Sequence, residues 1–210
     1  MPDKSDFRSD NKISVSVVGG LPPELRNSAL GLFWKAFSRK LRFTLGAEEK
    51  ALLFLQRCIV PEQAICAVDS AGRLAGFAAI KSHGYGFINP RLSDFYAEYG
   101  IPGGAIRALI MRKLDYQPAK NEMMIESLCV DESVRSMGIG QILLSHIKNL
   151  AYRQGKQDLI LDVIAENSGA RRLYERLGFC EIGRKNFVFL GPLFGFRRAV
   201  RMRFSLGTSD

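Results

Sequence analysis

The sequence lacks the residue patterns that mark metal centres, disulfide frameworks and membrane spans. Its 210 residues include only two histidines, His83 and His146, and four scattered cysteines that form no C-x-x-C pair. Because zinc ligands cluster at short spacings, these positions predict no metal site and reduced cysteines rather than disulfides. No run approaches the roughly 18 apolar residues of a spanning helix, and the amino-terminal segment has no apolar signal-peptide core. We therefore expect a soluble cytoplasmic protein with no membrane span.

Positive charge is what the chain has in excess. Lys and Arg number 30 against 21 Asp and Glu, which gives a formal net charge of +9. Such a charge attracts nucleic acid, an anionic membrane surface or a phosphorylated small molecule. Arginines are interleaved with apolar residues in RRAVRMRF, Arg197 to Phe204, a pattern that fits a strand with one solvated basic face or a nucleic-acid surface. Because no dedicated nucleic-acid motif accompanies it, we favour the solvated face and expect no nucleic-acid partner.

Hydrophobic patterning predicts a polar tail at residues 1–12 and a single mixed α/β domain at residues 13–210. The first half predicts one strand, two helices and a β-hairpin, at residues 13–18, 22–37, 47–59 and 63–84. The middle predicts one helix, at residues 104–114. From residue 123 strands and helices alternate, as in βαβ units. The strands are at residues 123–130, 158–165, 179–184 and 199–206, and the helices at residues 137–155 and 167–178.

A glycine loop separates the strand at residues 123–130 from the helix that follows. It reads R-x-x-G-x-G, with Arg135, Gly138 and Gly140 at the fixed positions. A Walker loop would need a lysine and a hydroxyl residue that are absent, and a Rossmann fingerprint would need glycine where Leu143 stands. The free N–H groups and the dipole at a helix N-terminus attract anions, so a phosphate is one candidate ligand and a packed strand the other candidate neighbour.

A second motif, NSGARRLYERLGF, lies one helix and one strand downstream, from Asn167 to Phe179. Alone it fits an ordinary amphipathic helix, capped by Asn167 and ended by Gly178. In this order and spacing, the two motifs resemble those of the GNAT superfamily of N-acetyltransferases. The resemblance is close over residues 123–184 and architectural before them. It implies an α+β fold whose mixed, mostly antiparallel central sheet is flanked by helices, with the fourth and fifth strands splayed apart.

The resemblance also implies acetyl-CoA as co-substrate, without a metal. Its pantetheine arm would lie between the splayed strands against backbone groups, and its pyrophosphate at the glycine loop. The implied binding residues are Leu128, Cys129, Val130, Arg135, Ser136, Met137, Gly138, Ile139, Gly140, Gln141, Asn167 and Tyr174.

The implied reaction is direct acetyl transfer to a primary amine of a small molecule, peptide or protein. By the resemblance, Tyr174 holds the family position of the general acid. A phenol with a pKa near 10 is protonated at neutral pH and can donate to the leaving thiolate. We favour Glu126 as the base, with Asp162 or water as alternatives. The glycine- and aromatic-rich segment 185–197 is expected to line an apolar acceptor pocket.

Two other functions stay open beside this one. They are an acyl-CoA-binding regulator without turnover and a basic nucleic-acid-binding module. The acceptor, the length of the acyl group and homodimer formation stay open as well.

Overall fold

The computed structural model describes residues 14–82, 84–186 and 198–207. Its strands form one seven-stranded sheet in the order β1-β2-β3-β4-β5-β7-β6. They are β1 (Val15–Gly19), β2 (Ala64–Asp69), β3 (Leu74–Lys81), β4 (Glu122–Val130), β5 (Asp158–Ile164), β6 (Cys180–Asn186) and β7 (Arg198–Ser205). β4 and β5 pair in parallel, and the other neighbours described are antiparallel. The predicted mixed, mostly antiparallel sheet is confirmed.

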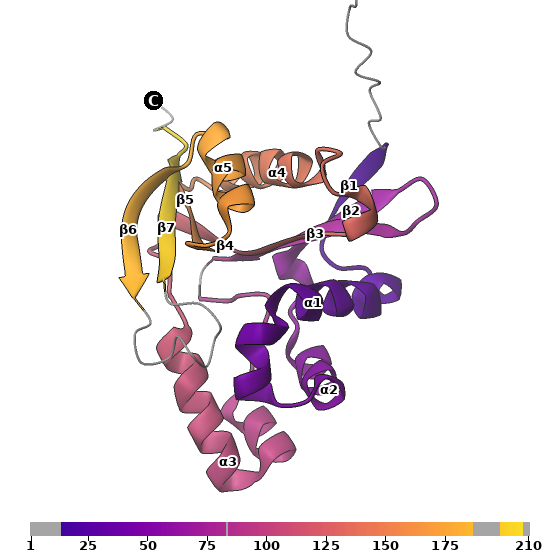
Figure 1. Cartoon of the computed structure of the whole chain (residues 1–210), viewed down its shortest axis with the longest axis vertical. Coiled ribbons are helices and arrows are strands. Elements are labelled where there is room, and N and C mark those ends of the chain that lie inside the picture. Colours follow the sequence, from indigo (N-terminus) through magenta and orange to yellow (C-terminus); the bar gives the residue numbers. More distant parts are fainter. Residues whose placement is uncertain (1–13, 83, 187–197, 208–210) are drawn as a thin grey trace, which may run out of the picture.

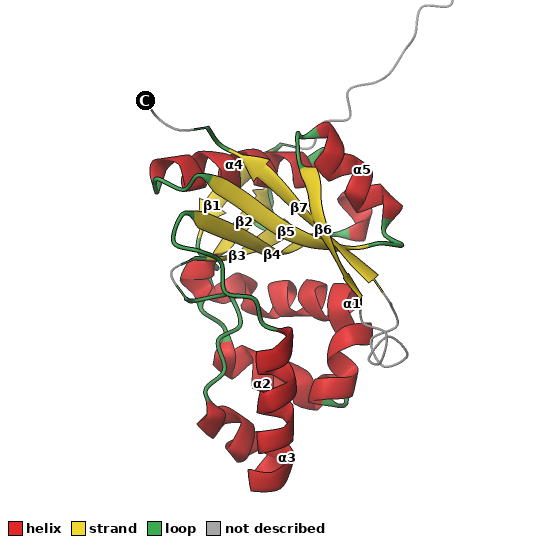
Figure 2. Cartoon of the chain, turned by 90° about the vertical axis from the view of Figure 1, so that its left-hand side faces the viewer, coloured by secondary structure: helices red, strands yellow, loops and turns green. Residues whose placement is uncertain are grey.

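Helices cover both faces of this sheet (Figure 1; Figure 2). One face carries α4 (Ile139–Arg153) and α5 (Ser168–Arg176), and the other carries α1 (Arg26–Leu45), α2 (Glu48–Cys58) and α3 (Leu92–Leu114). Short 3-10 turns precede α1, β2 and α4, at η1 (Pro23–Leu25), η2 (Pro61–Gln63) and η3 (Glu132–Val134). Each face buries its own apolar core, so the sheet separates two packed layers. Within the described residues, no helix is long and apolar enough to cross a membrane.

The elements that the two motifs predict are present with shifts of one or two residues at their ends. β4, α4 and β5 form a parallel crossover, and the helix predicted at residues 167–178 is α5. Asn167 caps α5, because its side chain accepts a hydrogen bond of 3.2 Å from the Ala170 N–H. Residue 13 of the first predicted strand and residues 187–197 of the predicted acceptor loop lie outside the described residues.

The largest departure from the predicted elements is α3, which starts at Leu92 rather than at residue 104. It consists of two helical pieces that meet at Gly100, where φ is 70° and the backbone leaves the helical region. Pro102 follows in the first turn of the second piece, where its missing N–H has little cost. A Cβ at Gly104 would lie 2.7 Å from the Phe95 carbonyl oxygen, so glycine there lets the two pieces pack closely. The glycines and proline that look like loop residues in the sequence form a helical hairpin.

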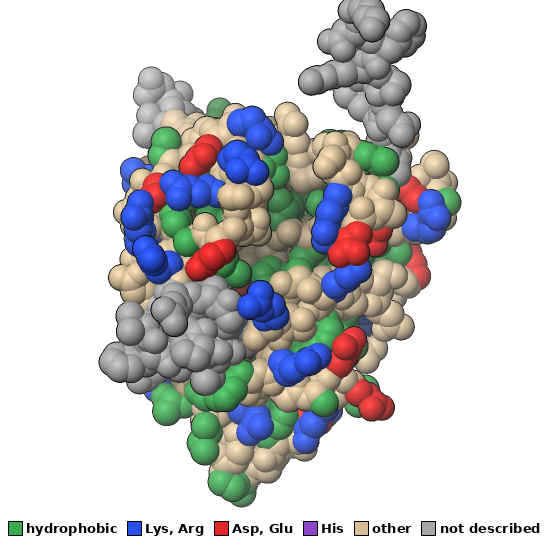
Figure 3. All heavy atoms as spheres, in the orientation of Figure 1, with side chains coloured by type: hydrophobic (Ala, Val, Ile, Leu, Met, Phe, Trp, Pro, Cys, Tyr) green, Lys and Arg blue, Asp and Glu red, His purple; other side chains and the backbone are tan. Residues whose placement is uncertain are grey.

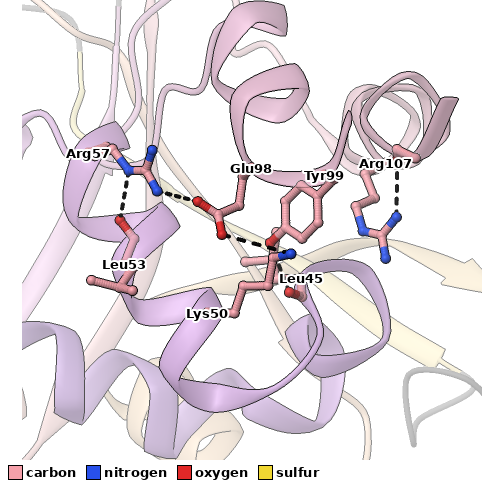
Figure 4. A network of polar contacts seen from close by, with 8 residues as sticks. Leu45, Lys50, Leu53, Arg57, Glu98, Tyr99 and Arg107 are labelled. Carbon is pink, nitrogen blue, oxygen red and sulfur yellow. Dashed lines mark hydrogen bonds and ion pairs between the residues drawn. The ribbon is translucent and has the colours of Figure 1, made fainter. Parts of the chain in front are cut away.

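A polar network fixes the first piece of α3 against α1 and α2 (Figure 4). The Tyr99 hydroxyl donates a hydrogen bond of 2.8 Å to the Leu45 carbonyl, and its ring lies 4.4 Å from the Arg107 guanidinium. Glu98 is ion-paired with Arg57 and Lys50 and is only 13% exposed. These contacts fix the first piece of α3 to the end of α1 and to α2.

The close packing around Gly76 of β3 predicts that any side chain at this position destabilises the fold. A Cβ there would lie 2.7 Å from the Cys129 carbonyl oxygen and 3.3 Å from Ile139 at the start of α4. Since backbone atoms must shift to admit it, Gly76→Ala should lower the free energy of unfolding by about 1–3 kcal/mol. Denaturant unfolding measures this, with Gly19→Ala of β1 as the matched control because nothing lies within 4 Å of its added Cβ. Equal stability of the two variants would contradict the close approach.

Candidate active site

The central feature of the candidate site is a gap between β4 and β5. The two strands pair only at their amino-terminal ends, where Glu122–Ile125 lies beside Asp158–Leu161. Beyond this point β4 stays paired with β3 as far as Val130, and β5 stays paired with β7 as far as Ile164. The facing edges of the two strands are therefore open to a ligand that can hydrogen-bond like a strand.

Strand pairing determines which β4 residues face this gap. The Asp131 N–H donates 2.9 Å to the Ala75 carbonyl, and antiparallel hydrogen-bonded pairs recur every second residue. Cys129, which is opposite Phe77, therefore directs its backbone groups toward β3. The N–H and C=O groups of Leu128 and Val130 point into the gap. Of the three predicted backbone contacts, these two lie on the open edge.

A register shift in β4 determines which of its side chains point to each face of the sheet. Ser127 pairs with Ala79 but Ile125 pairs with Ile80, so Glu126 is the extra residue of a β-bulge. Because of this shift, Leu128 and Val130 pack toward α4, as Ile125 does. Glu126 lies on the opposite face, in the wall of a cavity of about 910 Å³ between the sheet and α1 and α3.

The Glu126 carboxylate is held by a segment that the sequence did not single out. Its Oε2 accepts a hydrogen bond of 2.8 Å from the Phe87 N–H. A Cβ on Gly86 would lie 2.5 Å from Oε1, so only glycine leaves room for the carboxylate in this position. No motif marks Gly86 and Phe87, and a glycine between two aromatic residues is the only signal they give in the sequence.

Asp162, the alternative base, forms ion pairs with two cationic side chains. Arg201 donates to both carboxylate oxygens at 2.8 and 2.9 Å, and Lys185 donates to one at 3.0 Å. Burial alone would raise the pKa of Asp162, but the hydrogen bonds from Arg201 and Lys185 hold it below its usual value. Arg201 is only 13% exposed and stacks 3.6 Å from the Tyr116 ring centroid. The prediction that this arginine lies on a solvated basic face is wrong, because Asp162 across the β5–β7 pair draws it inward.

The predicted glycine loop forms a cluster of backbone donors at the start of α4. Within the described part of the chain, five backbone N–H groups of the loop and the first helical turn have no hydrogen-bond acceptor. They belong to Ser136, Gly138, Ile139, Gly140 and Gln141. Ser136 has φ 66° and Gly138 has φ 84°, a left-handed backbone that is costly for serine and easy for glycine. Successive N–H groups in such a loop at a helix N-terminus form a site for an anion.

The two glycines of this loop have different roles. Gly138 needs its positive φ, and nothing lies within 4 Å of an added Cβ. A Cβ at Gly140 would instead touch Leu173 and Leu128 at 3.4 and 3.7 Å, which is ordinary contact with β4 and α5. Just before the loop, Glu132 is ion-paired with Lys35 at 2.7 Å and with Arg135, the first residue of the motif, at 3.5 Å.

Tyr174 lies on the α4 and α5 face, in the core that packs against β4. It is 8% exposed, and within the described residues its hydroxyl makes no hydrogen bond. Burial, with a further contribution from Cys129, raises its pKa to about 12. Burial likewise raises the pKa of the Cys129 thiol to about 12. Tyr174 is therefore a protonated donor, and Cys129 is not a thiolate nucleophile.

Figure 3 shows a hollow near the centre of the molecular surface, below α4 and α5 in the matching view of Figure 1. Hydrophobic side chains line the hollow, and Lys, Arg, Asp and Glu surround it. The candidate site thus joins an open strand edge, a helix start with a cluster of backbone N–H donors and a separate cavity that holds Glu126.

The chain belongs to the acetyltransferase (GNAT) family, whose model matches residues 29–179. Members of this family use acetyl-CoA. The ribosomal protein bS18-alanine N-acetyltransferases of Escherichia coli K12 and Shigella flexneri are 35% identical to it over 72 residues, which are 34% of this chain. The match covers 49% of those relatives, so the chain spans about half the length of the curated relatives that it matches.

Solved structures share the fold at low sequence identity. The ribosomal-protein-S18-alanine N-acetyltransferase of Escherichia coli is 19% identical with a TM-score of 0.56, over 94% of this chain and 97% of that one. A GCN5-related N-acetyltransferase from Kribbella flavida is 19% identical with a TM-score of 0.58, over 91% and 97%.

Asp162 predicts a pH-dependent contribution to stability. Because the folded pKa of this carboxyl is lowered, its stabilisation is present above the unfolded pKa near 4 and is lost as the pH falls through the folded pKa. Asp162→Asn should therefore cost about 2 kcal/mol of unfolding free energy at pH 7. The difference from wild type should shrink below pH 4, as urea unfolding at both pH values can measure. Lys185→Met, which removes the more exposed partner, should cost less; a pH-independent Asp162→Asn penalty would contradict the ion-pair role.

Proposed function

We propose that this protein is an N-acetyltransferase that transfers the acetyl group of acetyl-CoA directly to a primary amine. The observation that supports this best is the open edge of β4 running from Glu126 to a helix start whose N–H groups have no acceptor in the described chain. A ligand with amide groups at one end and phosphates at the other fits such an arrangement.

The described residues fit acetyl-CoA in three places. Leu128 and Val130 offer strand-like donors and acceptors to the amides of a pantetheine arm. The donor cluster at the start of α4, with Arg135 beside it, offers charge and hydrogen bonds to a pyrophosphate. The third place is Asn167, whose side-chain oxygen caps α5, the helix that carries Tyr174.

Bound acetyl-CoA supplies a thioester: the amine nitrogen forms a bond to the acetyl carbon, the carbon–sulfur bond breaks, and one proton passes from the amine while the thiolate gains one. The chain's part is to place donors and acceptors for these charges. An N–H on the open edge of β4 would polarise the acetyl carbonyl. Tyr174 would stabilise the leaving sulfur by donating a hydrogen bond from its hydroxyl, and the proton that the thiolate gains would come from water.

Glu126 is the proposed acceptor of the amine proton. It faces the cavity on the α1 and α3 side, whereas the anion site and Tyr174 lie on the α4 and α5 side. An amine in the cavity would therefore approach the gap from the face opposite to Tyr174. Asp162 suits the role less well, because Arg201 and Lys185 already stabilise its negative form.

Ligand binding and turnover test the function together. By mass action, acetyl-CoA at 100 times its dissociation constant should raise the unfolding free energy by about 2.7 kcal/mol, seen as a shift in Tm. Release of free thiol on adding a panel of primary amines should then report turnover. A Tm shift without thiol release would favour the non-catalytic regulator, and no shift with millimolar acetyl-CoA would contradict acetyl-CoA binding.

Tyr174→Phe tests the hydrogen bond to the leaving sulfur. It should lower kcat about 10²-fold while leaving the dissociation constant for acetyl-CoA within a factor of about three, because the ring still packs and only the hydroxyl is lost. The matched control is Tyr152→Phe on α4, whose side chain is 56% exposed and does not belong to the core cluster that contains Tyr174. An unchanged kcat in Tyr174→Phe would exclude Tyr174 from stabilisation of the leaving sulfur.

Glu126→Gln tests the base. The amide keeps the size of the side chain but accepts no proton, so kcat/KM should fall about 10²-fold and lose the limb of its pH profile that reports carboxylate formation. Glu126→Asp should keep that limb with a smaller loss of rate. An unaltered pH profile in Glu126→Gln would assign the proton transfer to water.

A further inference from the structure

We propose that the acceptor is a primary amine attached to an extended apolar body, such as a long-chain alkylamine, an inference that rests on the function proposed above. The amine would meet Glu126 at the inner end of the cavity, and the apolar body would lie between α1 and α3.

The cavity is large and mostly apolar. Its volume of about 910 Å³ is at the upper end of the range of about 300–1,000 Å³ for small-molecule sites. It would exceed the needs of a single small amine. The apolar side chains that line it come mainly from α1 and α3 and include Phe33, Phe37, Leu41, Phe95, Leu109 and Met111.

An apolar path leads away from Glu126. The carboxylate is hydrogen-bonded to the Phe87 backbone, and the Phe87 ring lies 6.1 Å from Phe33. The Phe33 ring in turn lies 5.0 Å from Phe37, and both are only half-buried although they line the cavity. A ligand whose nitrogen meets Glu126 would therefore lay its next atoms along aromatic rings.

The exposed part of the lining on α3 is also apolar. Leu92 and Leu109 line the cavity and remain 50% and 48% exposed. Ile106 lies one helical turn from Leu109 and is 61% exposed. Figure 3 shows hydrophobic side chains at the surface over α3 at the lower end of the molecule. Large exposed apolar side chains that continue into a cavity favour a ligand with matching apolar surface.

The lining disfavours a polycationic acceptor such as a polyamine. Lys81 is ion-paired with Asp115, and Lys185 is ion-paired with Asp162, so two of the carboxylates in the lining are already matched by lysines. A second ammonium group on the aromatic path from Glu126 would lose its water there, whereas methylene groups would gain contact with aromatic carbon.

A series of n-alkylamines from butylamine to dodecylamine, each below its micellar concentration, tests this preference by thiol release with acetyl-CoA. The expected result is a rise in kcat/KM of about threefold for each added methylene until the cavity is filled. A flat or falling series, or faster turnover of spermidine or an Ala-Arg dipeptide than of dodecylamine, would overturn the inference and leave the proposed function standing.

Leu109→Asn gives the structural test. It should reduce kcat/KM for dodecylamine about tenfold and leave that for butylamine within twofold. The matched control is Leu53→Asn on α2, a leucine that is 52% exposed and outside the cavity lining. Should Leu109→Asn fail to fold, Ala108→Ser adds a polar group to the same wall with a smaller change in side-chain volume. An equal loss of kcat/KM for both amines in either variant would contradict the apolar path.

A binding measurement separates failure of this inference from failure of the proposed function. Calorimetry with coenzyme A present should show dodecylamine binding at least tenfold tighter than butylamine, weakened by Leu109→Asn. Such binding without thiol release from any amine would overturn the proposed reaction but keep the apolar site. Turnover of amines without this difference in affinity would do the reverse.

Discussion

The pairing that β4 and β5 lack is the constraint on which the rest of the structure depends. Two neighbouring strands that separate after Ile125 leave backbone groups without a partner in the sheet, which would be costly in a dry interior. The gap is kept open from outside, because β3 holds β4 and β7 holds β5 through most of their lengths. The crossover helix α4 then starts directly beyond the open edge of β4, so strand-like hydrogen bonds and an anion site follow one another along a single path.

The bulge at Glu126 gives this path two chemically different sides. Before and after it, apolar side chains of β4 pack toward α4, while Glu126 itself lies in the cavity wall on the other face. Without the extra residue, the carboxylate and Leu128 would share one face. A single inserted residue thus separates the Glu126 carboxylate, the proposed proton acceptor, from the protonated phenol of Tyr174 on the other side. Gly86 and the Phe87 N–H complete the arrangement by leaving space for the carboxylate and holding it.

What the sequence predicts well is local. The crossover from β4 to β5, the capped helix α5 and the glycine loop are encoded by patterns local to each element: hydrophobic periodicity, capping residues and glycine spacing. What it misses depends on partners far along the chain. Arg201 leaves its expected solvated face because Asp162, 39 positions away, draws it inward. The first piece of α3 is missed because Gly100 and Pro102 look like a loop until contacts such as Tyr99 with Leu45 hold the two pieces.

The burial of Tyr174 constrains how it can assist the leaving group. With its pKa raised to about 12, the phenol is a weaker acid than an ordinary thiol, whose pKa is near 8.5. Complete proton transfer to a free thiolate would therefore be uphill by a few kcal/mol, whereas donating a hydrogen bond costs no ionisation. Burial that weakens the acid also lowers the local dielectric and strengthens that hydrogen bond to a developing negative charge. In the proposed reaction Tyr174 would therefore stabilise the sulfur while the carbon–sulfur bond breaks, and water at the open hollow would protonate the thiolate afterwards.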